Sequence, residues 1–395
     1  MLAKRPKRLL SALRAAFRIV LFLSPFLFGF LPPALAIETI AEQAFLIDMT
    51  TGEVLFEKNA DQPMAPASMS KMMTAYMIFE RLRDGSLTLE DTFTVSENAW
   101  RKGGAKSGGS TMFLEPGKRV KLEDLLRGII VQSGNDACIV VAEALASSEA
   151  AFAEQMTVRA KELGLQNTVF KNATGWPDPE HLTTAQDLAL LAKRTITDFA
   201  EYYHYYAEKE FTYNTIRQIN RNPLLYKNID ADGLKTGHTV ESEYGLTASA
   251  TNGDRRLILV VNGLATKKDR SREPERLLNW GFSDFNNYRL FSAGEEVTEA
   301  DVWLGKEDKV PLVIEREMLL TIARKARHKM KVTVTFENPI PAPIAKGDPV
   351  AKLVLTVPGR DKLEVPLLAG AAVERLGLFG RLGTALKAIL WGESG

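Results

Sequence analysis

The order of apolar and polar positions predicts a helical region in the first half of this chain. Residues 69–79 contain no glycine or proline and are rich in apolar side chains, and a polar, proline-punctuated stretch precedes them. This pattern predicts a buried helix that begins at or just before Ser68. Residues 125–131 and 136–145 are two further apolar runs. We therefore expect Ser-Gly-Asn at 133–135 on a tight turn between two buried helices.

Strand-like patterns follow in the second half of the chain. Residues 244–250 and 257–261 are β-like runs, and Asn252-Gly253 lies between them. That dipeptide is typical of tight hairpins. The pattern predicts an antiparallel sheet, with the preceding segment 230–239 on one of its strands.

A change near residue 285, to short strand-like segments separated by proline-containing loops, indicates a second, smaller domain. Residues 310–314, 331–336 and 350–357 are strand-like, and 331–336 alternates clearly between apolar and polar positions. Prolines punctuate the loops between them, and no chemical motif lies here. We expect a β-rich domain over 285–370 that holds the larger domain off a membrane or binds a partner.

The first 36 residues have the composition of a targeting segment. They combine a basic front, an apolar core (19–31) and Ala-Leu-Ala at 34–36, which is typical of a cleaved secretory signal peptide. An uncleaved anchor is the alternative, but this core is short for a bilayer span. The remaining chain has a formal charge of −5, since the whole chain is +1 and this segment holds six basic and no acidic side chains. That charge argues against nucleic-acid binding.

The C-terminal segment, 371–395, predicts an amphipathic helix that lies on a membrane surface. A helix packed on its own protein is the alternative. Its glycines each lower helix propensity by about 1 kcal/mol, so folding would await lipid. The apolar residues at helical spacing are Val373, Leu376, Phe379, Leu382, Leu386 and Ile389.

Cysteine and histidine usage narrows the chemistry. Cys138 is the only cysteine, so no internal disulfide forms, and it is expected to be a buried, small apolar residue. The four histidines are scattered without metal-ligand spacing. We expect neither a metal nor a cofactor.

Three short motifs stand in order along the chain: Ser68-Met-Ser-Lys71, Ser133-Gly-Asn135 and Lys235-Thr236-Gly237. They match the S-x-x-K, S-x-N and K-T-G set of serine acyl-transfer enzymes that react with penicillin. Each alone is weak evidence, because S-x-x-K occurs by chance about once in a chain of this length. A second S-x-N at 96–98 lacks an apolar run before it and ranks lower.

The chemistry of the first motif explains its spacing. Residues three apart share a helix face, so Ser68 and Lys71 project side by side. A serine hydroxyl needs a neighbouring base, and a lysine is a base only when burial or nearby cations lower its pKa. The alternative is a helix-capping serine with an ordinary surface lysine.

The second and third motifs supply groups that suit a peptide ending in a carboxylate. In the functional interpretation Ser133 relays a proton and Asn135 holds the substrate backbone; the alternative is a plain turn. Lys235 offers a positive charge and Thr236 a hydroxyl. Gly237 allows a backbone to approach closely.

Beyond these motifs, the chain resembles the low-molecular-mass penicillin-binding proteins, the serine-type D-alanyl-D-alanine carboxypeptidases of peptidase family S11. The resemblance covers essentially the whole chain after the signal peptide. It implies an α/β (α+β) fold: a β-lactamase/transpeptidase-like catalytic domain over 37–284, with an antiparallel sheet and a helical cluster. Further segments that carry it are 109–114, 133–138, 211–214, 220–222, 235–239 and 279–282.

The resemblance also implies residue roles. Ser68 is the nucleophile and Lys71 its general base, while Ser133 relays the proton to the leaving amine. The N–H groups of Ser68 and His238 form the oxyanion hole. The residues implied in substrate binding are Asn135, Arg221, Lys235, Thr236, Gly237, His238 and Arg270, with Arg272 as the substitute for Arg270.

The expected activity is hydrolysis of the terminal D-Ala-D-Ala bond of peptidoglycan stem pentapeptides on the periplasmic side of the bacterial inner membrane, with β-lactams as covalent inhibitors. A D,D-endopeptidase of the same fold and a non-catalytic peptidoglycan-binding scaffold are the alternatives. A class A β-lactamase is disfavoured, because no E-x-x-L-N glutamate is present and Asp187 is expected to be structural. The glycine-rich segment 103–110 lacks the glycine before lysine that a phosphate loop needs, so we place it at the rim of the site.

Overall fold

The computed structural model describes residues 37–380 and 382 of this 395-residue chain. The expected signal peptide and most of the expected amphipathic tail lie outside the described residues.

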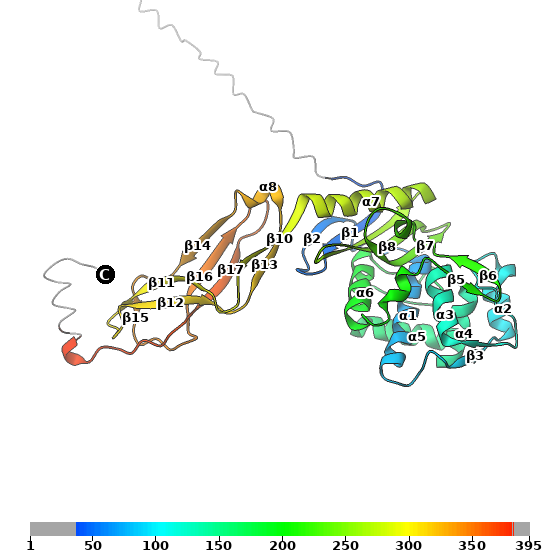
Figure 1. Cartoon of the computed structure of the whole chain (residues 1–395), viewed down its shortest axis with the longest axis horizontal. Helices are drawn as coiled ribbons and strands as arrows, with labels where there is room; N and C mark the ends of the chain where they lie inside the picture. The colour runs from blue at the N-terminus through cyan, green and yellow to red at the C-terminus, as the bar shows by residue number, and fades with distance from the viewer. Residues whose placement is uncertain (1–36, 381, 383–395) are drawn as a thin grey trace, which may run out of the picture. The chain divides into compact units, whose positions relative to one another are not determined.

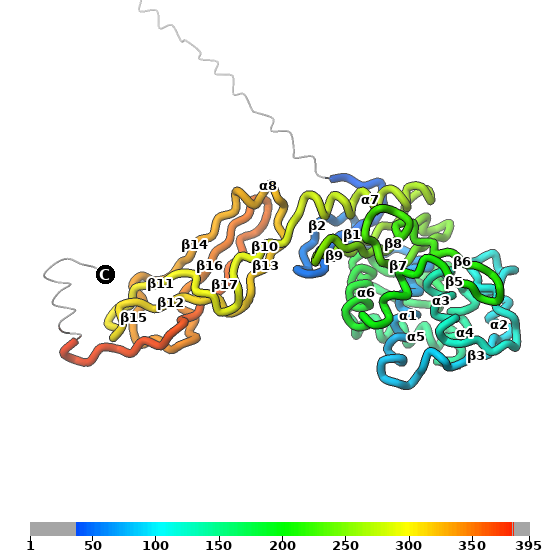
Figure 2. Tube along the Cα trace, in the orientation of Figure 1, coloured from blue at the N-terminus to red at the C-terminus, as the bar shows by residue number. Residues whose placement is uncertain are grey.

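A five-stranded antiparallel sheet organises the larger part of the fold (Figure 1). Its order is β2-β1-β9-β8-β7. The first strand of the chain, β1, pairs along its length with β9, more than 200 residues later (Figure 2). The predicted hairpin is confirmed: β8 ends at Asn252, which pairs with Arg255 of β9, and Gly253 and Asp254 form the two-residue turn. The strands are β1 (Gln43–Asp48), β2 (Val54–Lys58), β7 (Ala231–Thr239), β8 (Glu243–Asn252) and β9 (Arg255–Leu264).

Helices cover both faces of this sheet because its central strand is apolar on both sides. Leu257 of β9 faces α7 (Lys267–Asp284), where the backbone of Gly281 packs directly against it. Its neighbours Ile258 and Val260 join the core of the helical cluster on the other face. The helices of that cluster are α1 (Lys71–Arg83), α3 (Leu122–Arg127), α4 (Asn135–Ala146), α5 (Glu149–Glu162) and α6 (Ala185–Asp198).

Short elements complete the helical side and carry most of the residues of interest. They are the 3-10 turns η1 (Ala67–Ser70), η2 (Ala105–Ser107), η4 (Tyr203–Ala207) and η5 (Pro223–Tyr226), the π-helical turn η3 (Gly128–Gln132), the helix α2 (Glu97–Gly103) and the two-stranded pairs β3–β4 (Thr92–Thr94, Arg119–Lys121) and β5–β6 (Glu210–Tyr213, Ile216–Ile219).

The helix predicted after Ser68 is confirmed as η1 running into α1. It is almost entirely buried, which explains its mainly apolar sequence. Phe79 lies near its centre and packs against three aromatic rings, those of Phe199, Tyr202 and Tyr206, with centroids between 5.4 and 6.4 Å away. This aromatic cluster anchors the helix that carries the first motif.

The β-rich part predicted after residue 285 is confirmed. Its six-stranded sheet has the order β14-β16-β17-β12-β11-β15, and β10 pairs with β13. It has an apolar core of its own around Leu312, Leu353 and Leu367. The elements are β10 (Phe285–Phe291), β11 (Glu296–Trp303), β12 (Lys309–Ile314), β13 (Met318–Ala323), α8 (Arg324–Arg327), β14 (Lys331–Thr335), β15 (Ile340–Pro341), β16 (Pro349–Thr356) and β17 (Leu363–Ala369).

The prediction of a tail helix starting at residue 371 is wrong for its first two turns. Residues 371–377 are not helical, and Val373 and Arg375 form isolated bridges to Ile344 and Gly305. Val373 is buried in the core of the β-rich part, so its place in the apolar stripe reflects strand packing. Helix begins only at Leu378. Within 37–380 and 382, no helix is both long and apolar enough to cross a bilayer.

Truncating Phe79 tests the role of the aromatic cluster. We expect Phe79→Ala to lower the free energy of unfolding by about 3–5 kcal/mol, because the neighbouring side chains relax only partly into the cavity that the missing ring leaves. Val158→Ala, at a position that is 59% exposed, is the control and should stay within about 0.5 kcal/mol of the parent protein. Denaturant unfolding measures both, and equal small effects would contradict the assignment.

Candidate active site

Lys71 is the buried centre of the site. Its Nζ atom donates to Ser68 Oγ at 2.9 Å, to Asn135 Oδ1 at 2.8 Å and to the Thr174 carbonyl at 2.5 Å. An ammonium group has three N–H donors, and here each has an acceptor. The first two motifs therefore meet at one nitrogen, as the sequence predicts, and the third acceptor comes from a loop that sequence reasoning did not single out.

Burial lowers the pKa of Lys71, a change that a lysine needs if it is to act as a base. Its pKa is lowered from 10.5 to about 8, chiefly by removal from water; the nearby Cys138 thiol acts in the opposite direction, and the Arg221 guanidinium contributes to the lowering. Burial also holds the pKa of Lys235 well below its ordinary value, and the charge of Lys71 adds to this effect. Two buried lysines close together disfavour each other's charged form. A neutral Lys71 is therefore accessible near pH 8, within 3 Å of the Ser68 hydroxyl.

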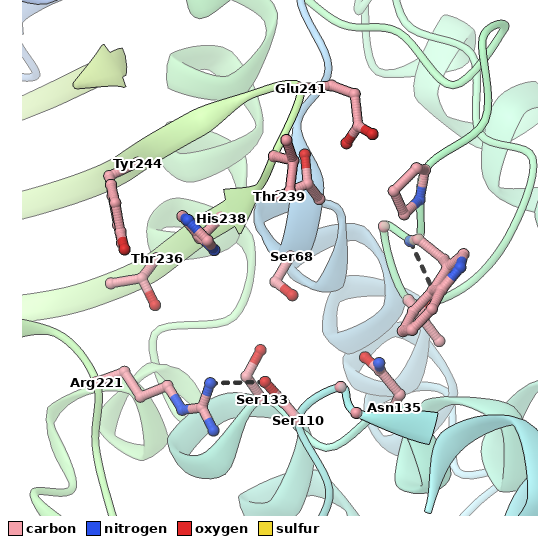
Figure 3. A pocket seen from close by; sticks show the side chains of 18 of the residues that line it. Ser68, Ser110, Ser133, Asn135, Arg221, Thr236, His238, Thr239, Glu241 and Tyr244 are labelled. Carbon is pink, nitrogen blue, oxygen red and sulfur yellow. Dashed lines mark hydrogen bonds between the residues drawn. The ribbon is translucent and has the colours of Figure 1, made fainter. Parts of the chain in front are cut away.

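The second motif lies on a strained turn. Ser133 ends η3 with a φ of 65°, in the left-handed region, and the Gly134 N–H donates to the Gly128 carbonyl. Asn135 opens α4. The turn between two buried elements is as predicted, and it directs Ser133 and Asn135 into a cleft (Figure 3).

Asp136, next to this turn, ties a second wall of the cleft to it. Its buried carboxylate accepts from Thr111 Oγ1 at 2.6 Å and from the N–H groups of Met112 and Leu114 at 3.0 and 3.1 Å. Those bonds hold the segment that carries Ser110 at the cleft. The last three residues of the glycine-rich stretch 103–110 thus border the cleft, as expected, while Gly103 is buried at the end of α2.

The third motif lies on β7, as predicted. Lys235 is buried, while Thr236 and Gly237 border the cleft. A Cβ added at Gly237 would lie 2.8 Å from the Pro66 carbonyl oxygen and 3.2 Å from Met69 Cγ. Glycine is thus required for β7 to pack against the turn that carries Ser68, a reason that differs from the expected approach of a substrate.

Two arginines and an aromatic pair complete the positive side of the cleft. Arg270 of α7 donates to the Gly237 carbonyl at 3.2 Å and lies over the Tyr244 ring, and burial lowers its pKa to about 10. Its buried Nε has no hydrogen-bond acceptor among the described residues. Arg221 donates to Ser110 Oγ at 2.6 Å, and the rings of His238 and Tyr244 pack against each other at a tilt of 32° (Figure 3). Arg270 borders this cleft, whereas Arg272 borders a different groove.

The cleft encloses about 850 Å³ and gathers most of the residues predicted for the site. Lys71 and Lys235 lie beneath its surface. Sequence reasoning missed Trp176, Tyr244 and Glu241, which carry no motif signal. The residues that border the cleft are Ser68, Gly108, Gly109, Ser110, Ser133, Asn135, Thr174, Gly175, Trp176, Pro177, Arg221, Thr236, Gly237, His238, Thr239, Val240, Glu241, Tyr244, Lys267 and Arg270.

Two residues that the sequence analysis did not assign to the site have structural roles. Ser96 of the second S-x-N caps α2 by accepting from the Ala99 N–H at 2.9 Å. Asp187 accepts from Thr168 Oγ1 at 2.6 Å and from the Asn167 N–H at 2.9 Å, as a structural carboxylate does. Neither borders the cleft.

A serine and a buried lysine on one helical turn, a Ser-x-Asn turn and a K-T-G strand around one cleft define a penicillin-interacting serine acyl-transfer enzyme. Residues 32–266 match the D-alanyl-D-alanine carboxypeptidase family, and residues 285–375 match the C-terminal domain of penicillin-binding protein 5. The chain belongs to the D-alanyl-D-alanine carboxypeptidase family, as a serine-type enzyme of peptidase family S11.

Individual relatives span nearly the whole chain. The carboxypeptidase DacC of Escherichia coli is 41% identical over 369 residues, covering 91% of this chain and 92% of its own length. DacA of the same organism is 39% identical, covering 87% and 86%. The crystal structure of penicillin-binding protein 5 from Haemophilus influenzae superposes with a TM-score of 0.72 at 36% identity, covering 86% of this chain and 99% of that one.

The lowered pKa of Lys71 predicts how acylation depends on pH. If Lys71 is the base for Ser68, the second-order rate of acylation by a β-lactam should rise with pH through about 8 and then level off, because a lysine accepts a proton only when it is neutral. Stopped-flow or mass-spectrometric rates between about pH 6 and 10 measure this. A rate that is flat through pH 8 would exclude Lys71 as the base.

Proposed function

We propose that this D-alanyl-D-alanine carboxypeptidase uses Ser68 as its nucleophile and Lys71 as its general base. The 2.9 Å contact between Lys71 Nζ and Ser68 Oγ, in a buried environment that lowers the lysine pKa, is the observation that carries the proposal. Ser68 Oγ attacks the carbonyl carbon of the penultimate D-Ala, and its proton passes to neutral Lys71.

The remaining groups act on the charges and protons that follow. The N–H groups of Ser68 and His238 stabilise the oxyanion of the tetrahedral intermediate. When the C–N bond breaks, Ser133 passes the proton from Lys71 to the leaving amine, and free D-alanine departs. Water then hydrolyses the ester at Ser68 and releases the shortened peptide.

Substrate recognition rests on the polar wall of the cleft. Thr236 and Arg270 bind the terminal carboxylate, while Arg221 and Lys235 add positive charge. Arg270 suits this role because it is partly desolvated and borders the cleft beside Gly237. Asn135 binds the peptide amide of the stem. A β-lactam occupies the same place and leaves its ester on Ser68.

We also assign a role to each domain and to the two terminal segments of the chain. Residues 1–36 export the protein to the periplasmic side of the inner membrane, and residues 37–284 form the catalytic domain. The β-rich domain begins at residue 285 and includes Val373, so its end lies beyond residue 370. Leu378, Phe379 and Leu382 are exposed by 70%, 92% and 65%, which favours contact of the tail with a membrane surface.

Release of D-alanine tests the reaction. The protein should release free D-alanine from a stem pentapeptide, and Ser68→Ala should abolish that release along with acylation by a β-lactam, because the nucleophilic oxygen is gone. A coupled D-amino-acid assay measures the product. Cleavage of cross-linked dimers without release from monomers would instead favour the D,D-endopeptidase, and a folded protein inactive on both would contradict both enzymes and favour the scaffold.

Arg270 and Arg272 provide a matched pair for carboxylate binding. Arg270→Gln should lower kcat/KM for the pentapeptide by about 10- to 100-fold, the range of one charge-assisted hydrogen bond, mainly through KM. Arg272→Gln removes the same charge two residues away, in another groove, and should change kcat/KM less than twofold. Steady-state kinetics of both variants decide the assignment, and equal losses would contradict it.

A further inference from the structure

A loop from the helical side clamps the turn that carries Ser68. The carbonyl groups of Ala173 and Thr174 accept hydrogen bonds from Thr74 Oγ1, at 2.8 Å, and from Lys71. The same loop brings His181 to the hydroxyl of Ser70, with 2.8 Å between Nε2 and Oγ. Both side chains are buried. Neither has a role in the reaction as described so far.

The direction of these hydrogen bonds follows from one backbone donor. The Lys171 N–H donates to His181 Nδ1 at 3.3 Å, so Nδ1 is the unprotonated nitrogen of the neutral ring. Nε2 then carries the proton and donates to Ser70 Oγ. The Ser70 hydroxyl in turn donates to the Ala67 carbonyl at 2.8 Å. We call this chain from His181 through Ser70 to Ala67 the imidazole relay.

The relay ends on the peptide group that precedes the nucleophile. The Ala67 carbonyl and the Ser68 N–H belong to the same planar unit, so a bond that holds the oxygen also sets the direction of the N–H. Ala67 has a φ of 46°, a left-handed conformation that is unfavourable for alanine. Such a conformation persists only where its surroundings hold it in place.

Gly175 closes the other side of the same peptide group. A Cβ added to it would lie 1.8 Å from the Ala67 oxygen and 3.0 Å from the Ser68 nitrogen. The loop backbone therefore packs directly against the Ala67–Ser68 peptide. Packing at Gly175 limits where this unit sits, and the relay limits how it is rotated.

We propose that His181 and Ser70 are positioning residues that orient the Ser68 N–H toward the oxyanion formed during acylation. The inference rests on the proposed function, in which Ser68 is the nucleophile and its N–H stabilises the oxyanion. His181 acts through Ser70 and touches no substrate atom.

The charge state of His181 agrees with this role. Burial lowers its pKa to about 4; the carboxylate of Asp178 raises it and the ammonium of Lys71 lowers it. The ring is therefore neutral between about pH 6 and 8, as the relay requires. A protonated ring would place a second N–H against the Lys171 N–H.

Variants of the full-length protein test the relay. His181→Phe and Ser70→Ala each break it, and Ser70→Thr keeps the hydroxyl. His328→Phe, at an exposed histidine of the β-rich domain, is the control for the histidine change. We expect His181→Phe and Ser70→Ala to slow Ser68 acylation by a β-lactam about 10- to 100-fold, less than the loss of an entire oxyanion donor. Ser70→Thr should recover most of the rate, and His328→Phe should match the parent.

Two binding measurements separate orientation from general damage. A peptide boronic acid forms a tetrahedral adduct on Ser68 that fills the oxyanion hole, so its affinity should fall in parallel with the acylation rate. Binding of the product tetrapeptide, which needs no oxyanion hole, should change less than twofold. Acylation within twofold of the parent in both variants, or equal losses for boronate and product, would overturn the inference.

The acylation and D-alanine measurements together distinguish a failure of this inference from a failure of the proposed function. A parent protein that is acylated at Ser68 but releases no D-alanine contradicts the carboxypeptidase reaction, while β-lactam rates still decide the relay. A parent protein that is never acylated overturns both. Ser70→Ala removes a single oxygen atom, so it keeps the comparison available if His181→Phe fails to fold.

Discussion

The buried ammonium group of Lys71 is the constraint around which the site is built. A cation removed from water needs an acceptor for each proton, and Lys71 finds them on Ser68, on Asn135 and on the Thr174 carbonyl. These acceptors come from three separate segments of the chain. Satisfying one nitrogen therefore brings together Ser68, the Ser-x-Asn turn and a loop that no motif marks. The same burial lowers the pKa of Lys71, as its proposed role as the base requires.

Close backbone approach is the second condition for this geometry. Gly175 packs against the peptide before Ser68 on one side, and Gly237 of β7 packs against Pro66 and Met69 on the other. A methyl group at either position would push the serine turn away from its neighbours. The turn is thus held between a loop of the helical cluster and an edge strand of the sheet, and the cleft opens where these two parts of the fold meet.

In the C-terminal tail, the helical spacing of apolar residues led to a wrong prediction of secondary structure. Val373 and Leu376 fit a helical stripe with the residues that follow, yet 371–377 is not helical and Val373 completes the core of the β-rich domain. Apolar residues spaced by three occur in both settings. The backbone of Ile344 forms a bridge with Val373, which favours the non-helical conformation of this segment. The glycines of the tail also lower its helix propensity.

The sequence alone determined the secondary structure around each motif, the hairpin at Asn252-Gly253, the two-part organisation and the family, because these depend on local periodicity and short motifs. It also placed Ser68 beside Lys71, since three residues span one helical turn. Only the tertiary structure decided what surrounds them. The third acceptor of Lys71, the position of Arg270 at the cleft and the contact of His181 with Ser70 join residues far apart in the chain, and no local pattern encodes such distances.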